Sequence, residues 1–294
     1  MSELKRTYPS WLNGEVKSVQ KEYTEPTRLL AEDGRLLSPG WARHNVFDYD
    51  RRNSKPTIHR KEWDFYQICN GEYMVQLSFA NISIGGYVSA VLIDLKHPNK
   101  NKKHAAGTIA DSTVLYLGGR DKYVLPPKGD VPNNVKMTIN GIGSASFEFD
   151  TKETSRTLWY KSKDGKCECK FEMDIPEGLE NITTVLPFKG HPTSYFMTTK
   201  QNCMPCHGFY RNGDIKVEFS KENTFCCLDW GRVNTPYKLV WYWGNGSGYV
   251  DGQDGKKHLF GFEITWGHDS HPAACCHRIS SPSFVYLLEP HRPN

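Results

Sequence analysis

The chain of 294 residues, 33.6 kDa in mass, is long enough for one large domain or two of ordinary size, with a sizeable buried core. Its 37 Lys and Arg side chains against 33 Asp and Glu give a formal charge of only +4, so we expect no nucleic-acid partner. The N-terminus lacks the apolar core of a signal peptide and no later stretch is long enough to span a membrane, which favours a cytoplasmic protein.

A polar N-terminal segment is followed by two predicted strands in which apolar and polar side chains alternate. Residues 1–39 are polar and interrupted by prolines, so we treat them as a polar N-terminal leader or wrapping segment. From residue 72 to 80, apolar and polar side chains alternate with period two, which indicates a strand. The alternation returns at 87–95 after Gly85-Gly86, and this predicts a hairpin.

Later strands carry stronger local signals. Asp164-Gly165 and Asn212-Gly213 are typical of two-residue hairpin turns. In the strand predicted at 259–266, Glu263 lies on the face opposite the aromatic residues. Many short strands, Gly, Pro and Asn turns, and no long segment of helical spacing predict an all-β sandwich or barrel.

Nine cysteines are an odd number in a chain without an export signal, which argues for reduced thiols. Cys203-Met-Pro-Cys206-His207 has the spacing of a c-type haem attachment site, and it could instead join Cys226 or Cys227 in a zinc site. Covalent haem attachment takes place outside the cytosol, and the second paired spacing usual for zinc is missing. We therefore favour buried thiols and predict no metal and no cofactor, with zinc as the alternative.

Two clusters of aromatic and charged residues are candidate ligand-binding sites. The first contains Trp41, Arg43, His44, Trp63 and Asp64, and the second contains Asp229, Trp230, Arg232, Trp241 and Trp243, with Glu263 on a later strand. Rings of this kind cover apolar ligands while a carboxylate transfers a proton. The structural alternative is that an Asp–Arg pair and large rings simply fill the end of a barrel.

The stretches GWARHNVFDYDR, KEWDFY, LDWGR and GFEITWG, in this order, resemble the family catalogued as domain of unknown function 2804. The likeness covers roughly residues 29–267, and its signature positions include both clusters up to Arg232. That family is similar to a lipocalin-like group that includes carotenoid 1,2-hydratases and tocopherol cyclases. The resemblance implies two lipocalin-like antiparallel β-barrel halves side by side, which we place at 40–187 and 188–294, and no settled activity.

The chain departs from the family pattern after Gly267. Residues 268–294 show little alternation and look foreign to the family. We expect an atypical, truncated end to the second half, without its last strands. An exposed sheet edge would then lower stability.

The leading functional hypothesis is a hydratase, cyclase or isomerase acting on an apolar isoprenoid or lipid-like small molecule. Asp229 or Glu263 would protonate an alkene, and a tryptophan of the second cluster would face the resulting cation. Arg232 would position Asp229, but an arginine partner lowers a carboxylate's pKa, which favours Glu263 as the acid if it is buried. The alternatives are a non-catalytic carrier of a hydrophobic ligand and a scaffold with filled barrels. Whether the chain is an enzyme, and its oligomeric state, stay open.

Overall fold

A computed structural model describes residues 21–97, 107–118, 125, 133–138, 145–151, 154–188, 190–237, 239, 241–266 and 276–280. Within these ranges the regular structure consists of strands and two single-turn 3-10 helices, η2 (Arg51–Asn53) and η3 (Thr57–His59), which confirms the all-β prediction. No helix in this part of the chain is long and apolar enough to cross a membrane.

The strands follow one another along the whole described chain. They are β1 (Thr27–Arg28), β2 (Gly40–Ala42), β3 (Phe47–Asp48), β4 (Arg60–Cys69), β5 (Tyr73–Asn81), β6 (Gly85–Asp94), β7 (Thr108–Leu117), β8 (Asn133–Thr138), β9 (Ala145–Thr151), β10 (Ser155–Ser162), β11 (Cys167–Asp174), β12 (Ile182–Phe188), β13 (His191–Asn212), β14 (Ile215–Phe219), β15 (Phe225–Asn234), β16 (Tyr242–Asp251), β17 (Lys257–Trp266) and β18 (Cys276–Ser280).

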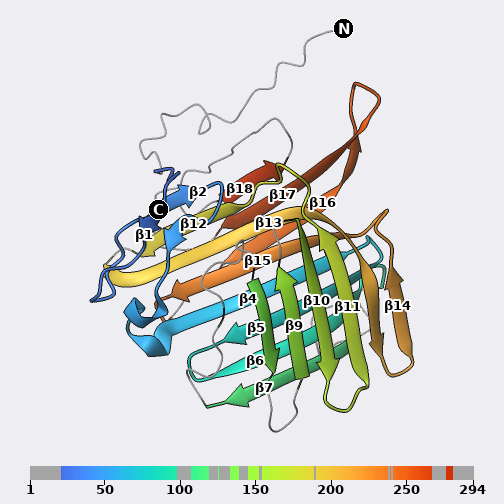
Figure 1. The fold of residues 1–294 in the computed structure, drawn as a ribbon, viewed down its shortest axis with the longest axis horizontal. Coiled ribbons are helices and arrows are strands. Elements are labelled where there is room, and N and C mark those ends of the chain that lie inside the picture. The colour runs from blue at the N-terminus through green and yellow to red at the C-terminus, as the bar shows by residue number, and fades with distance from the viewer. Residues whose placement is uncertain are drawn as a thin grey trace.

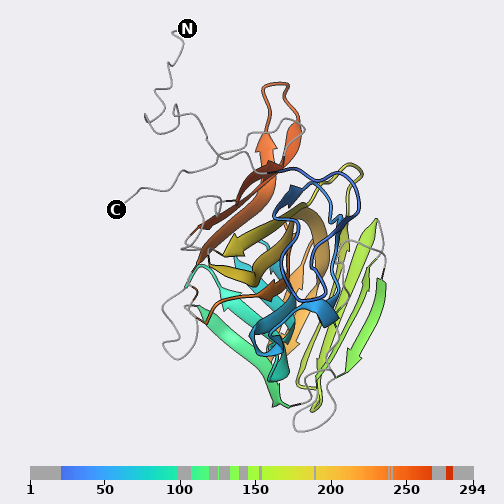
Figure 2. The ribbon, with the colours of Figure 1, turned by 90° about the vertical axis from the view of Figure 1, so that its left-hand side faces the viewer.

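One sheet of 13 strands dominates the molecule, with the hydrogen-bonded order β7-β6-β5-β4-β15-β13-β11-β10-β9-β8. Its centre is β13, a strand of 22 residues whose first part pairs with β12 and β15 and whose last part pairs with β11 and β14. Strands β9, β10 and β11 therefore cross β4 to β7 at a steep angle (Figure 1) and form a separate layer in the turned view (Figure 2). This arrangement is an orthogonal packing of two sheet layers that share a bent strand.

Two positions in the middle of β13 depart from regular strand geometry. The register with β15 shifts between Gln201 and Met204, and Cys203 adopts a left-handed φ of 64° at that point. Further along, Gly208 has a φ of +154°, and a Cβ there would overlap the carbonyl oxygen of Lys170 on β11. Only a residue without a side chain allows the two backbones to come this close.

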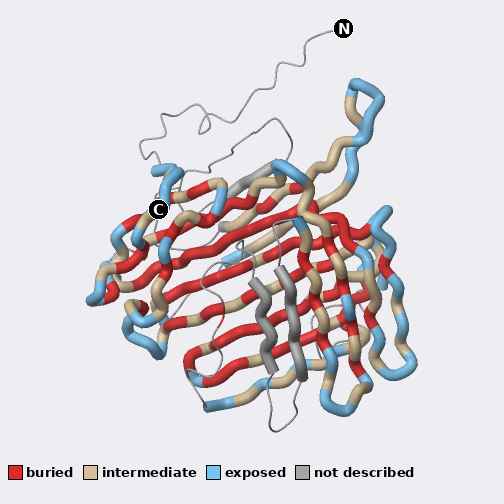
Figure 3. The backbone as a smooth tube through the Cα atoms, in the orientation of Figure 1, coloured by how far each residue is buried: buried red, intermediate tan, exposed pale blue. Residues whose placement is uncertain are grey.

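The main core lies between the two layers. It contains fully buried rings from β4, β5, β11, β13 and β15, among them Tyr66, Phe79, Phe171, Tyr195 and Trp230. The central strands are buried along most of their length, whereas the tip of the β16–β17 hairpin is exposed (Figure 3). Cys167 and Cys169 of β11 belong to this core, in line with the expectation of buried thiols.

The predicted barrels are not found. The strands at the ends of the order, β7 and β8, are not hydrogen-bonded to one another in the described residues, so the sheet does not close on itself there. Strand β4 pairs with β15 from Arg60 to Cys69, which joins the predicted halves 40–187 and 188–294 in one sheet. The boundary itself falls inside β12. Two separate lipocalin-like halves stay a prediction.

Both predicted hairpins are confirmed, since β10 pairs with β11 and β13 pairs with β14, but the turns differ from the prediction. Asn212 pairs with Ile215, so the two-residue turn between β13 and β14 is Gly213-Asp214, and residues 163–166 connect β10 to β11. The β5–β6 hairpin is also present, but its turn precedes Gly85-Gly86, which lies within β6. A Cβ on Gly85 would overlap the carbonyl oxygen of Tyr116, so this glycine permits close strand pairing rather than a turn. Of residues 268–294, only β18 is described, and it pairs with β17.

Candidate functional site

The floor of the candidate site is the face of the large sheet that points away from the main core. Side chains directly opposite one another on paired strands share a face. One such row crosses β12, β13, β15, β4, β5 and β6 and consists of Thr184, Thr198, Gly231, Trp63, Ala80 and Tyr87. The next row contains Ile182, Lys200, Asp229 and Phe65.

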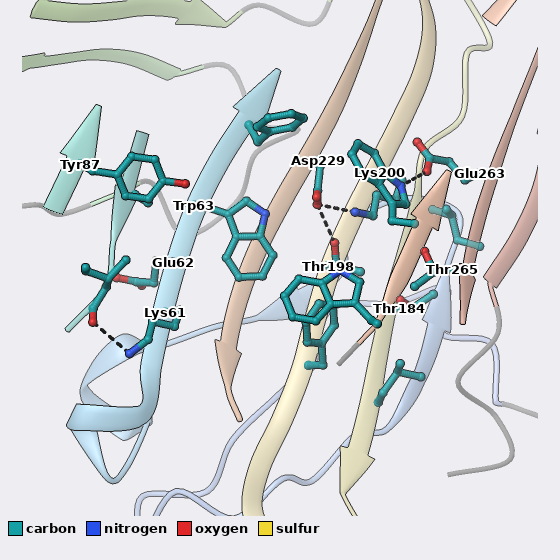
Figure 4. A pocket seen from close by; sticks show the side chains of 18 residues that line it. Lys61, Glu62, Trp63, Tyr87, Thr184, Thr198, Lys200, Asp229, Glu263 and Thr265 are labelled. Carbon is teal, nitrogen blue, oxygen red and sulfur yellow. Dashed lines mark hydrogen bonds and ion pairs between the residues drawn. The ribbon is translucent and has the colours of Figure 1, made fainter. Parts of the chain in front are cut away.

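Strands β16 and β17 cover this face and enclose a cavity of about 360 Å³. Trp243 of β16, Glu263 and Thr265 of β17, and Trp241 just before β16 line its wall. Figure 4 shows Glu263 and Thr265 around the same cavity as Lys200 and Asp229. The volume lies in the range typical of small-molecule pockets, about 300–1,000 Å³. Side chains alternate along β17, so Glu263 points into the cavity whereas Phe262 and Ile264 point to the opposite face of the strand.

Aromatic rings form most of the apolar wall. The ring centroids of Trp63 and Phe196 are 5.9 Å apart, and those of Phe196 and Trp241 are 6.0 Å apart. At the other end, Phe65 meets Trp243 edge to face at 5.9 Å. A Cβ on Gly231 would overlap the Trp63 indole, so the glycine of the LDWGR stretch makes room for this ring. The wall therefore suits an apolar ligand.

An ion pair lies within this wall. Lys200 Nζ is 2.5 Å from Asp229 Oδ1, and their side chains are only 9% and 15% exposed. Thr198 Oγ1 lies 3.2 Å from the same carboxylate oxygen and 2.8 Å from the carbonyl oxygen of Trp230, and its single proton is shared between these two acceptors. The Lys200 ammonium also lies 4.6 Å from the centre of the Trp243 ring, a cation–π distance. Asp229 is thus held as the partner of a buried lysine.

Glu263 has a different environment, although it lines the same cavity. Trp243 Nε1 donates to its Oε2 at 2.5 Å, and the Cys227 thiol donates to its Oε1 at 3.1 Å. The residue is 3% exposed, and this burial raises its pKa to about 7, while Lys200 and the two hydrogen bonds oppose the rise. Near neutral pH a large fraction of Glu263 therefore carries a proton.

The opposite face of the same strands carries a second charge pair. Arg232 Nη2 donates to Asp64 Oδ1 at 3.0 Å, with the two side chains 0% and 2% exposed. The Arg232 guanidinium also stacks 4.2 Å from the Trp230 ring. Burial raises the pKa of Asp64, and the nearby arginine opposes the rise. The expected Arg232–Asp229 pair is wrong, because residues three apart in a strand point to opposite faces.

The N-terminal candidates lie at an edge of the sheet. Arg43 reaches Glu22 at 3.1 Å and Glu180 at 3.4 Å, and its guanidinium lies 5.6 Å from the Trp41 ring. His44 is exposed. The cavity brings together the predicted residues Trp63, Asp229, Trp241, Trp243 and Glu263, whereas its lining does not include Trp41, Arg43, His44, Asp64, Trp230 and Arg232. The polar lining residues that the sequence analysis missed include Lys200, in a Thr-Thr-Lys-Gln stretch that matches no motif, and also Lys61, Glu62, Thr184, Thr198 and Thr265.

The Cys203, Cys206 and His207 side chains do not converge. Cys203 Sγ lies where a Cβ on Gly261 would be, Cys206 is in the main core, and His207 is half exposed beside Glu172. Among the described residues there is no group of three or more His, Cys, Asp or Glu that could hold a metal ion. Neither the haem nor the zinc alternative finds a ligand set in this part of the chain.

The comparisons with known proteins confirm the family resemblance. The model of the family described as Domain of unknown function (DUF2804) matches residues 20–274. The crystal structure of kievitone hydratase from Nectria haematococca aligns with a TM-score of 0.43 and 11% identity, over 78% of this chain and 64% of that one. A Nitrosomonas europaea protein assigned as a candidate AttH aligns with a TM-score of 0.32 and 12% identity, over 76% and 68%. No curated protein matches the chain.

Proposed function

The chain belongs to the family described as Domain of unknown function (DUF2804), and we propose that it is a hydratase, cyclase or isomerase of an apolar isoprenoid or lipid-like small molecule. Glu263 is the proposed acid. The observation that carries the proposal is a buried carboxyl whose pKa is raised to about 7, in the wall of a ring-lined cavity of about 360 Å³. A proton donor is most effective when its pKa lies near the working pH.

In this mechanism the protonated Glu263 gives its proton to one carbon of a carbon–carbon double bond. In a hydration, a water oxygen adds to the other carbon and the proton that the water loses returns to Glu263. In an isomerisation or cyclisation, Glu263 takes back a proton from a neighbouring carbon. Each route leaves the carboxyl as it began, so no further reactant is needed.

The other charged residues receive different roles. Asp229 is paired with Lys200 at 2.5 Å, which makes it a poor proton donor, and we assign it the positioning of Lys200. Ligand contact is assigned to Trp63, Trp241 and Trp243. Trp41, Arg43 and His44 at the sheet edge, and Asp64, Trp230 and Arg232 in the core, then stabilise the fold rather than bind the ligand.

Four further expectations accompany this proposal. A hydrophobic small molecule is the proposed partner, because apolar side chains form most of the cavity wall. No nucleic-acid partner is proposed, because the net charge is only +4. A cytoplasmic location and two lipocalin-like halves are carried forward as parts of the same proposal.

The test starts from the purified chain. Bound ligand is extracted and identified by mass spectrometry, and related alkenes are then screened for turnover. The Glu263→Gln variant should lose about 10²–10⁴-fold in turnover, the usual contribution of a general acid. It should keep ligand binding, measured as quenching of tryptophan fluorescence. Glu218→Gln, on the exposed strand β14, is the matched control. Unchanged turnover in Glu263→Gln would overturn the assignment.

The second candidate function is a non-catalytic carrier of a hydrophobic ligand. It is favoured by the Lys200–Asp229 pair, which is already complete without a substrate. A ligand that co-purifies with the chain and is released unchanged, with no turnover of related alkenes by the wild type, would support the carrier. Turnover that depends on Glu263 would exclude it.

A further inference from the structure

Lys200 is a charged residue of the cavity lining, and the proposed function gives it no contact with the substrate. Its ammonium has three N–H donors. One is directed to Asp229 Oδ1 at 2.5 Å, and the face of Trp243 lies 4.6 Å away. No other acceptor contacts Nζ among the described residues, although Lys200 lines the cavity. A ligand inside the cavity can therefore supply the missing acceptor.

The charges around Lys200 restrict what this ligand group can be. The Lys200–Asp229 pair is neutral as a whole, and burial raises the pKa of Glu263 to about 7, so below neutral pH its carboxyl is mostly uncharged. A ligand carboxylate would add a buried negative charge without a partner, which is costly. A carbocation would lie beside an ammonium. A neutral oxygen acceptor satisfies the free donor without either cost.

The other charged residues that line the cavity, Lys61 and Glu62, do not change the net charge around Lys200. Lys61 Nζ donates to the carbonyl oxygens of Ile58 and Ile82, and burial lowers its pKa. It lies four residues from Phe65 along β4, hence about 13 Å from the Lys200 row at about 3.3 Å per residue. Glu62 is paired with Arg51 and accepts from the Tyr49 hydroxyl at 2.9 Å.

The ring of Trp243 supports the same conclusion. Its indole N–H is used by Glu263 and its face is already near the Lys200 ammonium, so it is poorly placed to stabilise a cation on the substrate. Among the tryptophans predicted for that role, Trp230 lies in the core and Trp241 is 47% exposed. The cavity is better suited to a reaction that develops negative charge on an oxygen near Lys200.

We propose that the substrate carries a neutral ketone conjugated to its double bond, and that the ketone oxygen accepts a hydrogen bond from Lys200 Nζ. This inference rests on the proposed function and names its substrate class. The apolar body of the molecule would then lie against Trp63 and Phe196. Lys200 is the binding and polarising residue, and Asp229 is a positioning residue that holds its ammonium.

The chemistry balances for hydration of such an enone. A water oxygen bonds to the β-carbon, the carbon–carbon π electrons move toward the carbonyl, and the oxygen becomes enolate-like beside Lys200. The α-carbon then takes the proton of Glu263, and the carbonyl double bond forms again. The proton lost by the attacking water returns to the Glu263 carboxylate, so enone and water give a β-hydroxy ketone.

The test uses β-ionone, an isoprenoid dienone, and geranic acid, a conjugated isoprenoid carboxylate, as probes. Binding is followed by tryptophan fluorescence, and the carbonyl contact is followed by the absorption band of the dienone. A hydrogen bond from an ammonium should move this band to longer wavelength in the wild type and in Glu263→Gln. The double variant Lys200→Met with Asp229→Asn stays charge-balanced and should lose the shift. It should also bind β-ionone about 10-fold more weakly or worse, the usual effect of losing a hydrogen bond to a charged group.

The outcomes separate this inference from the proposed function. A band shift that depends on Lys200, without any turnover, would keep the ketone contact and reject the hydratase. Turnover of unconjugated alkenes that depends on Glu263, with no shift on β-ionone, would keep the enzyme and overturn the ketone contact. Tighter binding of geranic acid than of β-ionone would also overturn it, as would a covalent Lys200 adduct trapped by borohydride. Failure of β-ionone to bind the wild type would do the same.

Discussion

At the scale of single residues, two carboxyl groups of one cavity have different neighbours. Asp229 has an ammonium at 2.5 Å, whereas Glu263 has an indole N–H and a thiol. Burial raises the pKa of Glu263 to about 7, although Lys200 and the two hydrogen bonds oppose the rise. This difference in surroundings is the basis for proposing Glu263, and not Asp229, as the acid.

The raised pKa of Glu263 predicts a dependence of stability on pH. The pKa is 4.5 in a model peptide and about 7 in the fold, so the unfolded chain loses this proton first as pH rises. The free energy of unfolding of the wild type should therefore fall by about 3 kcal/mol between pH 4.5 and 7, relative to Glu263→Gln. Urea unfolding of both proteins at several pH values measures the difference. If the free energies of unfolding of the wild type and Glu263→Gln changed in parallel with pH, the raised pKa of Glu263 would be contradicted.

The Arg232–Asp64 pair should be structural. Replacing Arg232 by Met leaves Asp64 buried without its partner, which should cost about 3–5 kcal/mol of unfolding free energy. Adding Asp64→Leu should recover a large part of the loss, because the uncompensated charge disappears. Arg52→Met, in a pair whose side chains are 86% and 36% exposed, is the control and should cost at most about 1 kcal/mol. A double variant as unstable as Arg232→Met would contradict this account.

The sequence predicted part of the cavity and missed its lysine. Trp63, Asp229 and Glu263 could be predicted because they belong to aromatic and acidic clusters on strands with an alternating pattern. Lys200 was not, since its partner is set by the pairing of β13 with β15, which no local pattern records. The error on Arg232 was avoidable: with a period of two, positions 229 and 232 cannot share a face.

At the scale of elements, β13 belongs to both layers, and Gly208 lets its backbone pass close to β11. Gly208→Ala should be costly, because the added Cβ meets the carbonyl oxygen of Lys170 as well as requiring a φ of +154°. Gly213→Ala is a matched control in the following turn, with a φ of +57° and nothing within 4 Å of the added Cβ. The overlap should make Gly208→Ala less stable than Gly213→Ala by about 1–3 kcal/mol, measured by urea unfolding. Equal losses would mean that the close approach is not needed.

The hairpins could be predicted from the sequence, whereas the bend of β13 could not. The β13–β14 hairpin was recognised from Asn212-Gly213 because turn residues are a local signal, although the turn itself consists of Gly213-Asp214. The bend of β13 was not, because it depends on Gly208 meeting a strand that lies more than 30 residues earlier in the chain. Gly85 shows the same limit, since its role is close pairing with β7 rather than a turn.

At the scale of the whole molecule, composition and alternation predicted the all-β class but not the pairing. The contact between β4 and β15 joins segments that are more than 150 residues apart, and nothing in either segment specifies the other. The resemblance to a lipocalin-like group suggested closed barrels. The described strands instead form a folded sheet with a shared core, because β13 contributes to both layers.

This shared sheet predicts one cooperative unfolding transition for the intact chain. Tyr66 and Leu158, from the stretch 40–187, pack in the same core as Tyr195 and Trp230, from the stretch 188–294. Neither stretch can bury these side chains alone, so both should lose structure together. In scanning calorimetry the calorimetric and van't Hoff enthalpies should agree, and near-UV circular dichroism should give the same midpoint as far-UV. Two resolved transitions would support independent halves and contradict the shared core. The charge-balanced variant Lys200→Met with Asp229→Asn, whose altered pair faces the cavity, should shift this single transition without splitting it.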